Sequence, residues 1–204
     1  GAADKLLGQL PVRRLLSGQA AELAELGAEP CRAGSAWTWD GVRFRVLHPP
    51  QGAGWDGNDS SCVLAVENAA GGILLPGDIE APAERALLAA SGGELASRVL
   101  LAPHHGSATS STPELVAAVR PEYVLYATGY RNRFGFPLAE VKQRWRAAGA
   151  RGLATADTGA IEFRLGADGQ LQGPWLTRQA QRRHWTHLPP ELRNSPFFLQ
   201  PGIQ

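Results

Sequence analysis

The middle of the chain alternates short apolar strands with helices, and this alternation constrains the fold more than any other feature. The predicted strands cover residues 62–67, 73–75, 98–102, 122–127, 153–156 and 161–165, and the predicted helices cover residues 82–90, 112–119 and 137–148. Strands that alternate with helices indicate an α/β fold. Asp40-Gly41, between apolar residues 37–39 and 42–47, is a strong hairpin signal. Because a hairpin joins antiparallel strands, we expect mixed sheets.

The two ends of the chain differ from this central pattern. We predict the end of a helix at residues 3–7, a strand at 12–16 and a helix at 19–26. From residue 173 onward the sequence is rich in Gln, Arg and Pro, which predicts an extended tail that packs its aromatic side chains on the domain or on a partner. We therefore divide the chain into a domain, residues 1–172, and a tail, residues 173–204.

The composition narrows the class of protein. Hydrophobic residues make up 44% and charged residues 19% of the 204 residues, which is a globular balance. No apolar run approaches the roughly 18 residues that cross a bilayer. Cys31 and Cys62 are too few for a disulfide framework or a thiolate-rich zinc knot. The chain begins Gly1-Ala2-Ala3 and contains no Met, so we expect it to be a processed or cut part of a longer protein.

Charge is divided unevenly along the chain. Residues 1–129 contain 9 Lys and Arg against 14 Asp and Glu, whereas residues 130–204 contain 11 against 5. A basic second part can attract a polyanion, but a solvated, Arg-rich surface explains the charge alone at least as well. Motifs for nucleotide cofactors, such as Gly-x-Gly-x-x-Gly or a P-loop, do not occur, and neither does the Gly-x-Ser-x-Gly of serine hydrolases.

Candidate chemistry lies where apolar strands end. Asp78 follows the strand at 73–75 through a Pro-Gly turn, and it either faces a site or caps the helix that begins near residue 82. His104 and His105 follow the strand at 98–102 and precede Gly106. Imidazole is the commonest metal ligand, so metal binding is favoured over a pair of hydrogen-bonded loop histidines. Asp and His ligands together suit zinc, manganese or iron.

These three residues supply only part of a metal site. A hydrolytic centre with two metal ions needs more ligands than Asp78 and the His pair provide. The other histidines, His48, His184 and His187, are unconvincing ligands, since His48 can simply end a strand and the other two lie in the predicted tail. The polar residues 58–61 lead into a strand and, taken alone, are best explained as a turn.

The ordered set of motifs resembles the carboxy-terminal metallo-β-lactamase-like domain of ComEC, the competence-related DNA internalisation family. The resemblance covers roughly residues 1 to 165 and rests on motifs that occur in the family's order. These motifs are residues 47–49, 58–64, 75–79, 103–107, 110–111 and 132–135. The Gly-Asp and His-His-Gly elements occur across metallo-β-lactamase-like hydrolases, while the Asn-Asp-x-Ser and Asn-x-(aromatic)-Gly stretches are typical of ComEC.

Two features depart from the family pattern. The chief metal motif of the superfamily, a His-x-(His or Asp)-x-Asp-His run, would lie immediately before residue 1 and is absent from the chain. Phe136 stands where the family tends to have a His before Pro137. The resemblance therefore implies a four-layer αββα sandwich, of the α/β or α+β class, that is incomplete at its N-terminus. We expect the chain by itself to be inactive.

The resemblance also implies roles for individual residues. Asp78 is similar to the carboxylate that bridges two metal ions, and one of His104 and His105 is similar to the late His ligand, while the other orients substrate or a ligand. The remaining implied residues line the site or contact phosphate: Asn58, Ser61, Ser107, Ser110, Ser111, Arg131, Asn132 and Arg133. For Ser110 and Ser111, capping of the following helix is an equal alternative.

The implied activity is metal-dependent phosphodiester hydrolysis with two divalent ions, zinc or manganese, in the complete domain. In ComEC-like proteins this activity would degrade the non-transported DNA strand. The implied partners are single-stranded DNA and the membrane channel portion of the same full-length protein. The implied location is a soluble domain of a bacterial inner-membrane protein, on the periplasmic side. Two alternatives remain: a catalytically silent module that binds single-stranded DNA or is structural, and a related hydrolase of another ester.

Overall fold

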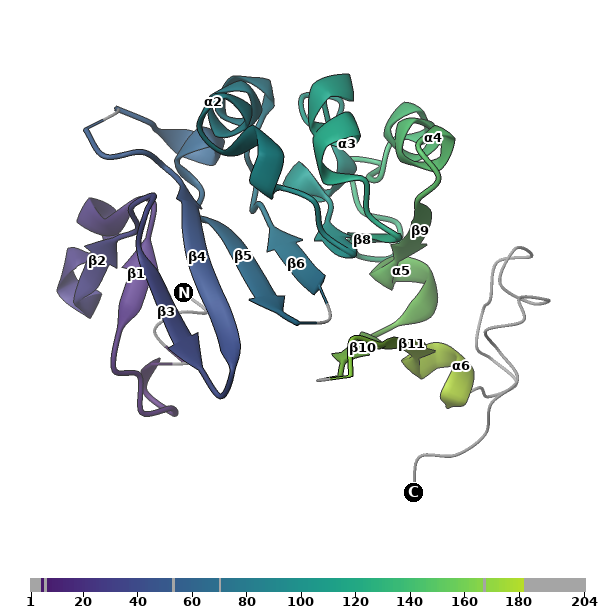
Figure 1. Cartoon of the computed structure of the whole chain (residues 1–204), viewed down its shortest axis with the longest axis horizontal. Coiled ribbons are helices and arrows are strands. Elements are labelled where there is room, and N and C mark those ends of the chain that lie inside the picture. The colour runs from purple at the N-terminus through teal and green to yellow at the C-terminus, as the bar shows by residue number, and fades with distance from the viewer. Residues whose placement is uncertain (1–4, 6, 53, 70, 167, 182–204) are drawn as a thin grey trace.

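A seven-stranded mixed sheet forms the centre of the computed structural model, which describes residues 5, 7–52, 54–69, 71–166 and 168–181 (Figure 1). In spatial order the strands are β3 Ala36–Trp39, β4 Val42–His48, β5 Val63–Asn68, β6 Gly71–Leu75, β7 Val99–Leu101, β8 Tyr123–Tyr126 and β9 Arg151–Ala154. Strands β3 to β6 pair antiparallel, and β6 to β9 pair parallel. The predicted mixed α/β architecture is therefore confirmed.

Two small sheets flank the large one. Strand β1 (Leu15–Ser17) pairs in parallel with β2 (Ala28–Pro30), and β10 (Ile161–Leu165) pairs antiparallel with β11 (Leu171–Leu176). The helical segments are η1 Ala20–Leu26, η2 Gly57–Ser60, α2 Ala81–Ser91, η3 Gly92–Glu94, η4 Pro103–Gly106, α3 Pro113–Val119, α4 Ala139–Ala147, α5 Thr155–Thr158 and α6 Thr177–Ala180. Within the described ranges, no helix combines the length and apolar character needed to cross a bilayer.

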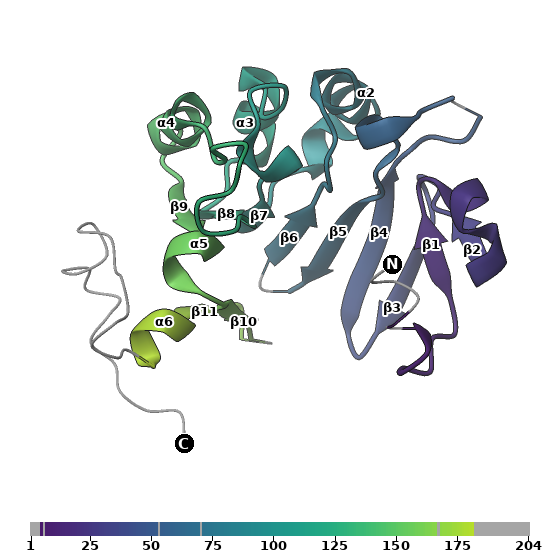
Figure 2. The same cartoon turned by 180° about the vertical axis from the view of Figure 1, so that it is seen from behind.

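Helices α2, α3 and α4 cover one face of the large sheet (Figures 1 and 2). On that face Ala65, Leu74, Leu100 and Val124 are aligned across four strands and are at most 3% exposed. The opposite face is also apolar: Val99 and Tyr123 on it are buried, and its leucines are partly buried, namely Leu64, Leu75, Leu101, Leu125 and Leu153. A sheet that is apolar on both faces is typical of an inner layer of a sandwich.

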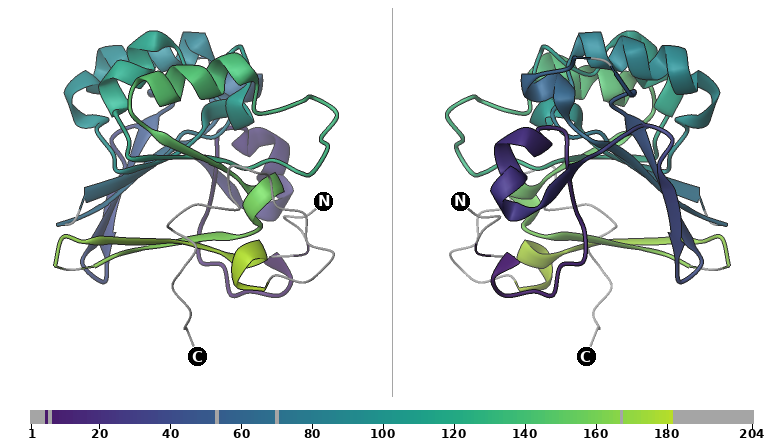
Figure 3. Two further views of the ribbon diagram at one scale, coloured as in Figure 1. Left: turned by 90° about the vertical axis from the view of Figure 1, so that its right-hand side faces the viewer. Right: turned by 90° about the vertical axis from the view of Figure 1, so that its left-hand side faces the viewer.

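The described residues form three of the four layers that the resemblance implied. The helices lie on the large sheet, and the β10–β11 pair lies beyond the sheet's other face, followed by the single-turn helix α6 (Figure 3). The sequence did not predict β2 or β11. The boundary drawn after residue 172 falls inside β11, because residues 171–176 pair with β10. Most of the predicted helix at 3–7, and residues 182–204 of the predicted tail, lie outside the described residues.

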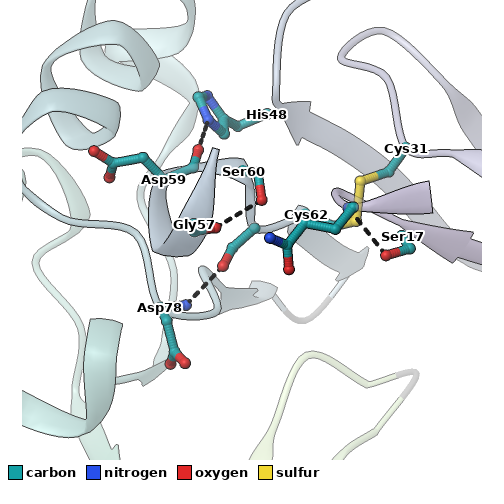
Figure 4. Close-up of a disulfide and its surroundings, with 10 residues drawn as sticks. Ser17, Cys31, His48, Gly57, Asp59, Ser60, Cys62 and Asp78 are labelled. Carbon is teal, nitrogen blue, oxygen red and sulfur yellow. Dashed lines mark hydrogen bonds between the residues drawn. A yellow bond between two sulfur atoms is a disulfide. The ribbon is translucent and has the colours of Figure 1, made fainter. Parts of the chain in front are cut away.

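A disulfide between Cys31 and Cys62 joins the β1–β2 unit to the start of β5 (Figure 4). The amide of Cys31 also donates to the carbonyl oxygen of Ser17 at 3.0 Å. Gly18 lies so close to Ser60 that a Cβ on it would meet the Ser60 carbonyl oxygen at 1.6 Å. The sequence argument excluded a disulfide framework and did not predict this single bridge, because spacing along the chain does not show which cysteines meet.

His48, at the end of β4, is 1% exposed and holds the η2 turn in place. Its Nε2 lies 2.8 Å from the carbonyl oxygen of Asp59, and its ring meets the edge of Trp55 at 5.0 Å between centroids. Because a carbonyl oxygen can only accept, Nε2 is assigned the proton. Burial lowers the pKa of His48 below its ordinary 6.5, although the hydrogen bond to Asp59 opposes this shift.

Glu84 in α2 is fully buried and joins this helix to the loop before α3. Its two carboxylate oxygens accept hydrogen bonds from the amides of Ser111, at 2.5 Å, and Thr112, at 2.7 Å. Burial raises the pKa of Glu84, while these donors and nearby Arg144 oppose the shift. The hydroxyl of Thr112 accepts from the amide of Leu115 at 3.3 Å, so Thr112 is the N-cap of α3.

We expect the disulfide to stabilise the fold substantially. Replacing both Cys31 and Cys62 by Ser removes a bridge between residues 31 positions apart, which the loop-entropy relation values at about 3–4 kcal/mol. Urea unfolding at pH 7 should show this decrease in the free energy of unfolding. Dithiothreitol should produce a similar loss in the natural chain and none in the double variant. Equal stability of all four samples would contradict the prediction.

We also expect the fold to lose stability as the pH falls below about 6.5, through His48. The unfolded chain binds a proton at His48 near its ordinary pKa, while the folded chain binds it only at lower pH, so acid favours unfolding. The measurement is the free energy of unfolding from pH 7.5 to 5.0. The variant His48→Gln, whose amide can still donate to Asp59, should show a shallower pH dependence, and an identical slope would count against this role.

Candidate functional site

Two neighbouring parallel strands present the candidate site from their carboxyl ends. Strand β6 is followed by the Pro76-Gly77-Asp78 turn, and β7 is followed by η4, which contains His104 and His105. The amide of His104 donates to the carbonyl oxygen of Gly77 at 3.1 Å, so the two turns are fixed to each other. His105 Nε2 then lies 3.4 Å from Asp78 Oδ1. The structure thus brings together the carboxylate and one of the two imidazoles that the sequence singled out.

The backbone of η4 is left-handed at three successive residues. The φ angles are +45° at His104, +56° at His105 and +87° at Gly106. Residues with a Cβ adopt this region at a cost of about 1–2 kcal/mol each, and such strain is often stored at functional sites. At Gly106 a Cβ would lie 2.7 Å from the Cβ of Pro137, so glycine is required by both conformation and space. With this backbone conformation, both imidazoles face carboxylates in the segment that follows β6.

A second pair of groups, which the sequence argument missed, lies beside the first. His104 Nδ1 is 3.1 Å from Glu80 Oε1, and it also lies 3.3 Å from the hydroxyl of Thr109. Asn58 donates to the same Glu80 oxygen at 3.1 Å. The amide of Glu80 donates to Asp59 Oδ1 at 2.7 Å. The spacing of Asp78 and Glu80, two residues apart after an apolar strand, was the available signal for this second carboxylate.

Ser61 positions the carboxylate of the first pair. Its hydroxyl oxygen accepts a hydrogen bond from the amide of Asp78 at 3.1 Å. At Gly77 the φ angle is +64°, and a Cβ there would lie 2.8 Å from the Cβ of Ser61. Figure 4 shows Asp78 near the η2 turn, with its carboxylate pointing away from the disulfide. Asn58 and Ser61, expected from the resemblance as polar residues of the site, therefore contact Glu80 and the Asp78 backbone respectively.

The three serines after the His pair form hydrogen bonds that hold this loop in place. The hydroxyl of Ser107 lies 3.0 Å from that of Thr109. The hydroxyl of Ser110 donates to the carbonyl oxygen of Pro103 at 2.8 Å, and the amide of Ser111 donates to Glu84. All three serines are at most 6% exposed. Neither serine side chain caps the following helix, since the N-cap of α3 is Thr112 and the hydroxyl of Ser110 bonds back to Pro103 and Ser107.

The loop that carries Arg131, Asn132 and Arg133 reaches the site through its last residue. The side chain of Asn132 is engaged with Phe136 within the loop, donating to its carbonyl oxygen at 2.7 Å and accepting from its amide at 3.0 Å. The ring of Phe136 lies 5.7 Å from that of His104, between centroids. Arg131 and Arg133 of this loop are exposed.

The donors at the site match a divalent metal in type but not in number. Two ligands of one tetrahedral zinc, each about 2.1 Å from the ion, lie about 3.4 Å apart, and the Asp78–His105 distance is 3.4 Å. A zinc site needs three or four protein ligands. Among the described residues no group of three or more His, Cys, Asp or Glu side chains could hold a metal ion. The described residues alone therefore do not form a complete metal site.

The other candidate histidines do not extend this set within the described structure. His48 is buried and faces the Asp59 carbonyl oxygen and Trp55. Among the described residues its Nδ1 has no hydrogen-bond partner. His184 and His187 lie outside the described residues.

Comparison with known proteins shows that the chain is similar to part of several bacterial proteins. It is 40% identical over 163 residues to "Competence protein ComA" of Neisseria gonorrhoeae, covering 80% of this chain and 23% of that protein. It is 37% identical to "Uncharacterized protein YcaI" of Escherichia coli, covering 69% and 19%. It is 33% identical to "Recombination protein 2" of Haemophilus influenzae, covering 71% and 18%. The chain thus spans about a fifth of the length of these relatives.

The sequence profile described as the Metallo-beta-lactamase superfamily matches residues 4–130. This match includes the strands β3 to β8 and the turns that carry Asp78, His104 and His105. The mixed sheet, the helices on one of its faces and the paired carboxylate and imidazole agree with that assignment. Because the match covers more than half of the 204 residues, the chain belongs to the metallo-beta-lactamase superfamily.

Proposed function

We propose that this chain is part of the phosphodiesterase domain of a ComEC-like DNA uptake protein, and that the complete domain hydrolyses the non-transported DNA strand. Relatives named as a competence protein and a recombination protein support a task in DNA uptake. Membership of the metallo-beta-lactamase superfamily supports hydrolytic chemistry. The observation that carries the proposal is the pairing of Asp78 Oδ1 with His105 Nε2 at 3.4 Å, at the carboxyl ends of β6 and β7.

In this proposal Asp78 and His105 are two ligands of a divalent cation, zinc or manganese. His105 is preferred to His104, because His104 Nδ1 already faces Glu80 and Thr109. His104 and Glu80 then form a second pair, which orients substrate or a second ion. A divalent ion held by such ligands lowers the pKa of bound water and neutralises charge on phosphate oxygens. In the net reaction the water oxygen bonds to phosphorus, and the ester oxygen that leaves receives the proton.

The remaining ligands are proposed to come from a segment of the full-length protein outside these 204 residues. The described residues supply two donors at one point where at least three are needed. The second face of the large sheet supports the same idea, because Leu64, Leu75 and Leu101 on it are only partly buried although the β10–β11 pair lies beyond this face. We therefore propose that the isolated 204-residue chain has little or no hydrolytic activity.

We propose that the domain works on the periplasmic side of the inner membrane, next to the channel portion of the same protein. The disulfide between Cys31 and Cys62 supports this side, because disulfides persist in the periplasm and are rare in the reducing cytosol. The bridge reaches the residue next to Ser61, so it also supports the hydrogen bond that positions Asp78. DNA arriving from outside would meet the site before it enters the cell.

A second candidate function is a module that binds single-stranded DNA without cleaving it. It is favoured by the lack of a third metal ligand among the described residues and by the exposed arginines at 131 and 133. Binding that weakens steeply with salt, needs no metal and is never followed by cleavage in the full-length protein would support this function.

Cleavage of single-stranded DNA by the full-length protein, with manganese or zinc, tests the leading proposal. Asp78→Ala removes a proposed ligand, so we expect the cleavage rate to fall more than about 100-fold. The matched control is Asp168→Ala, which removes an exposed carboxylate in the β10–β11 turn and should leave the rate unchanged. Undiminished cleavage by the Asp78→Ala variant would remove this carboxylate from the mechanism.

Ser61→Ala tests the positioning of Asp78. The change leaves the Asp78 amide without its acceptor while keeping the carboxylate itself, so we expect a loss of about 10-fold in metal affinity and cleavage rate. Metal affinity is measured by titration calorimetry on the full-length protein. Ser61→Thr, which keeps a hydroxyl, should recover part of the loss. If Ser61→Ala bound metal as tightly as the natural protein, Ser61 would have no positioning role.

A further inference from the structure

We propose that the loop formed by residues 129–137, here called the aromatic loop, binds single-stranded nucleic acid by base stacking. An unpaired base stacks on the planar groups that Tyr130, Phe134 and their arginine neighbours present, and Arg131 and Arg133 attract the flanking phosphates. This inference rests on the proposed function and adds to it the surface that selects single strands. The sequence argument assigned phosphate contacts to the arginines but gave no role to the aromatic rings.

The two outer rings of the loop are unusually exposed. Tyr130 is 58% exposed and Phe134 is 59% exposed, although both are large apolar side chains. Exposed aromatic rings are costly for a monomer to keep in water, and clusters of them mark interaction sites. The rings therefore require an explanation outside the packing of the fold.

The aromatic loop is held in shape by its own hydrogen bonds. The side chain of Asn132 donates to the carbonyl oxygens of Gly129 and Phe136 and accepts from the amide of Phe136. The amide of Gly135 donates to the Asn132 carbonyl oxygen at 3.1 Å. A loop that is already ordered loses little conformational entropy when it binds a ligand, so its rings can contact the ligand without rearrangement.

A ladder of contacts between planar groups, partly stacked and partly edge-to-face, runs from the surface of the loop to His104 in the candidate site. The guanidinium carbon of Arg133 lies 4.7 Å from the centre of the Phe134 ring. Phe134 stacks on Phe136 with 5.5 Å between centroids, and Phe136 meets His104 at 5.7 Å. Arg131 lies in the same way over Tyr130, at 5.3 Å. Bases stack on aromatic rings and on arginine planes alike, so a strand that follows this ladder is led toward Asp78 and His105.

The charge of the aromatic loop fits a nucleic acid. Arg131 and Arg133 are its charged residues, and residues 129–137 contain no Asp or Glu. Alternating rings and cations match the alternating bases and phosphates of a single strand. A duplex presents its phosphates but keeps its bases paired, so it can use the arginines and cannot use the rings. Selection of single strands therefore depends on Tyr130 and Phe134.

Binding measured without metal separates this inference from the proposed function. Fluorescence anisotropy of a labelled 20-nucleotide oligo-dT, with EDTA present, reports the affinity of the 204-residue chain while cleavage is blocked. We expect Phe134→Ala to weaken single-strand binding about 10-fold and to leave the binding of a 20-base-pair duplex within about twofold. Phe134→Trp should retain single-strand binding. Trp39→Ala removes a still more exposed ring, on the edge strand β3, and should change neither affinity.

Arg133→Ala should weaken single strands and duplexes alike and reduce the dependence of affinity on salt. Equal single-strand affinity of the natural chain, Phe134→Ala and Tyr130→Ala would overturn the inference. So would binding of vesicles of anionic phospholipid that depends on Phe134 without any binding of DNA. If single strands bind through Phe134 but the full-length protein never cleaves them, this inference stands and the phosphodiesterase proposal fails.

Discussion

One backbone hydrogen bond, from the amide of His104 to the carbonyl oxygen of Gly77, connects the two turns on which the candidate site depends. It joins the carboxyl ends of β6 and β7, whose parallel pairing already brings these turns to the same edge of the sheet. Asp78 and His105 then approach to 3.4 Å. The register of β6 against β7 is fixed by Leu74 and Leu100, which are fully buried under the helices. The packing of the core therefore determines the geometry of the candidate site.

Several contacts from distant parts of the chain keep that arrangement rigid. Ser61 accepts from the Asp78 amide, and the disulfide at the adjacent Cys62 ties this segment to the β1–β2 unit. On the other side, Glu84 holds the amides of the loop that follows the His pair. A metal site loses affinity when its ligands are free to move, so such supporting contacts matter nearly as much as the ligands. The left-handed backbone at His104 and His105 is tolerated because these contacts fix it.

Much of the fold followed from periodicity, and less of the site did. The strands, the hairpin at Asp40-Gly41 and the N-cap at Thr112 were predictable because each depends on residues close in sequence. The Cys31–Cys62 bridge and the Glu80–His104 pair were not, because each joins residues that only the tertiary fold brings together. Asp78 and the His pair were singled out by the strand ends that carry them, but which imidazole lies beside Asp78 depends on a left-handed turn that two adjacent histidines do not reveal.

The central claim is that Asp78 and His105 hold one side of a divalent metal centre that other parts of the full-length protein complete. The most direct measurement is an anomalous difference map, at the zinc absorption edge, from crystals of the complete domain grown with zinc. The account predicts a peak within about 2.2 Å of Asp78 Oδ1 and His105 Nε2, with further ligands from outside residues 1–204. A complete domain whose zinc is bound elsewhere, or by His104 in place of His105, would contradict the account.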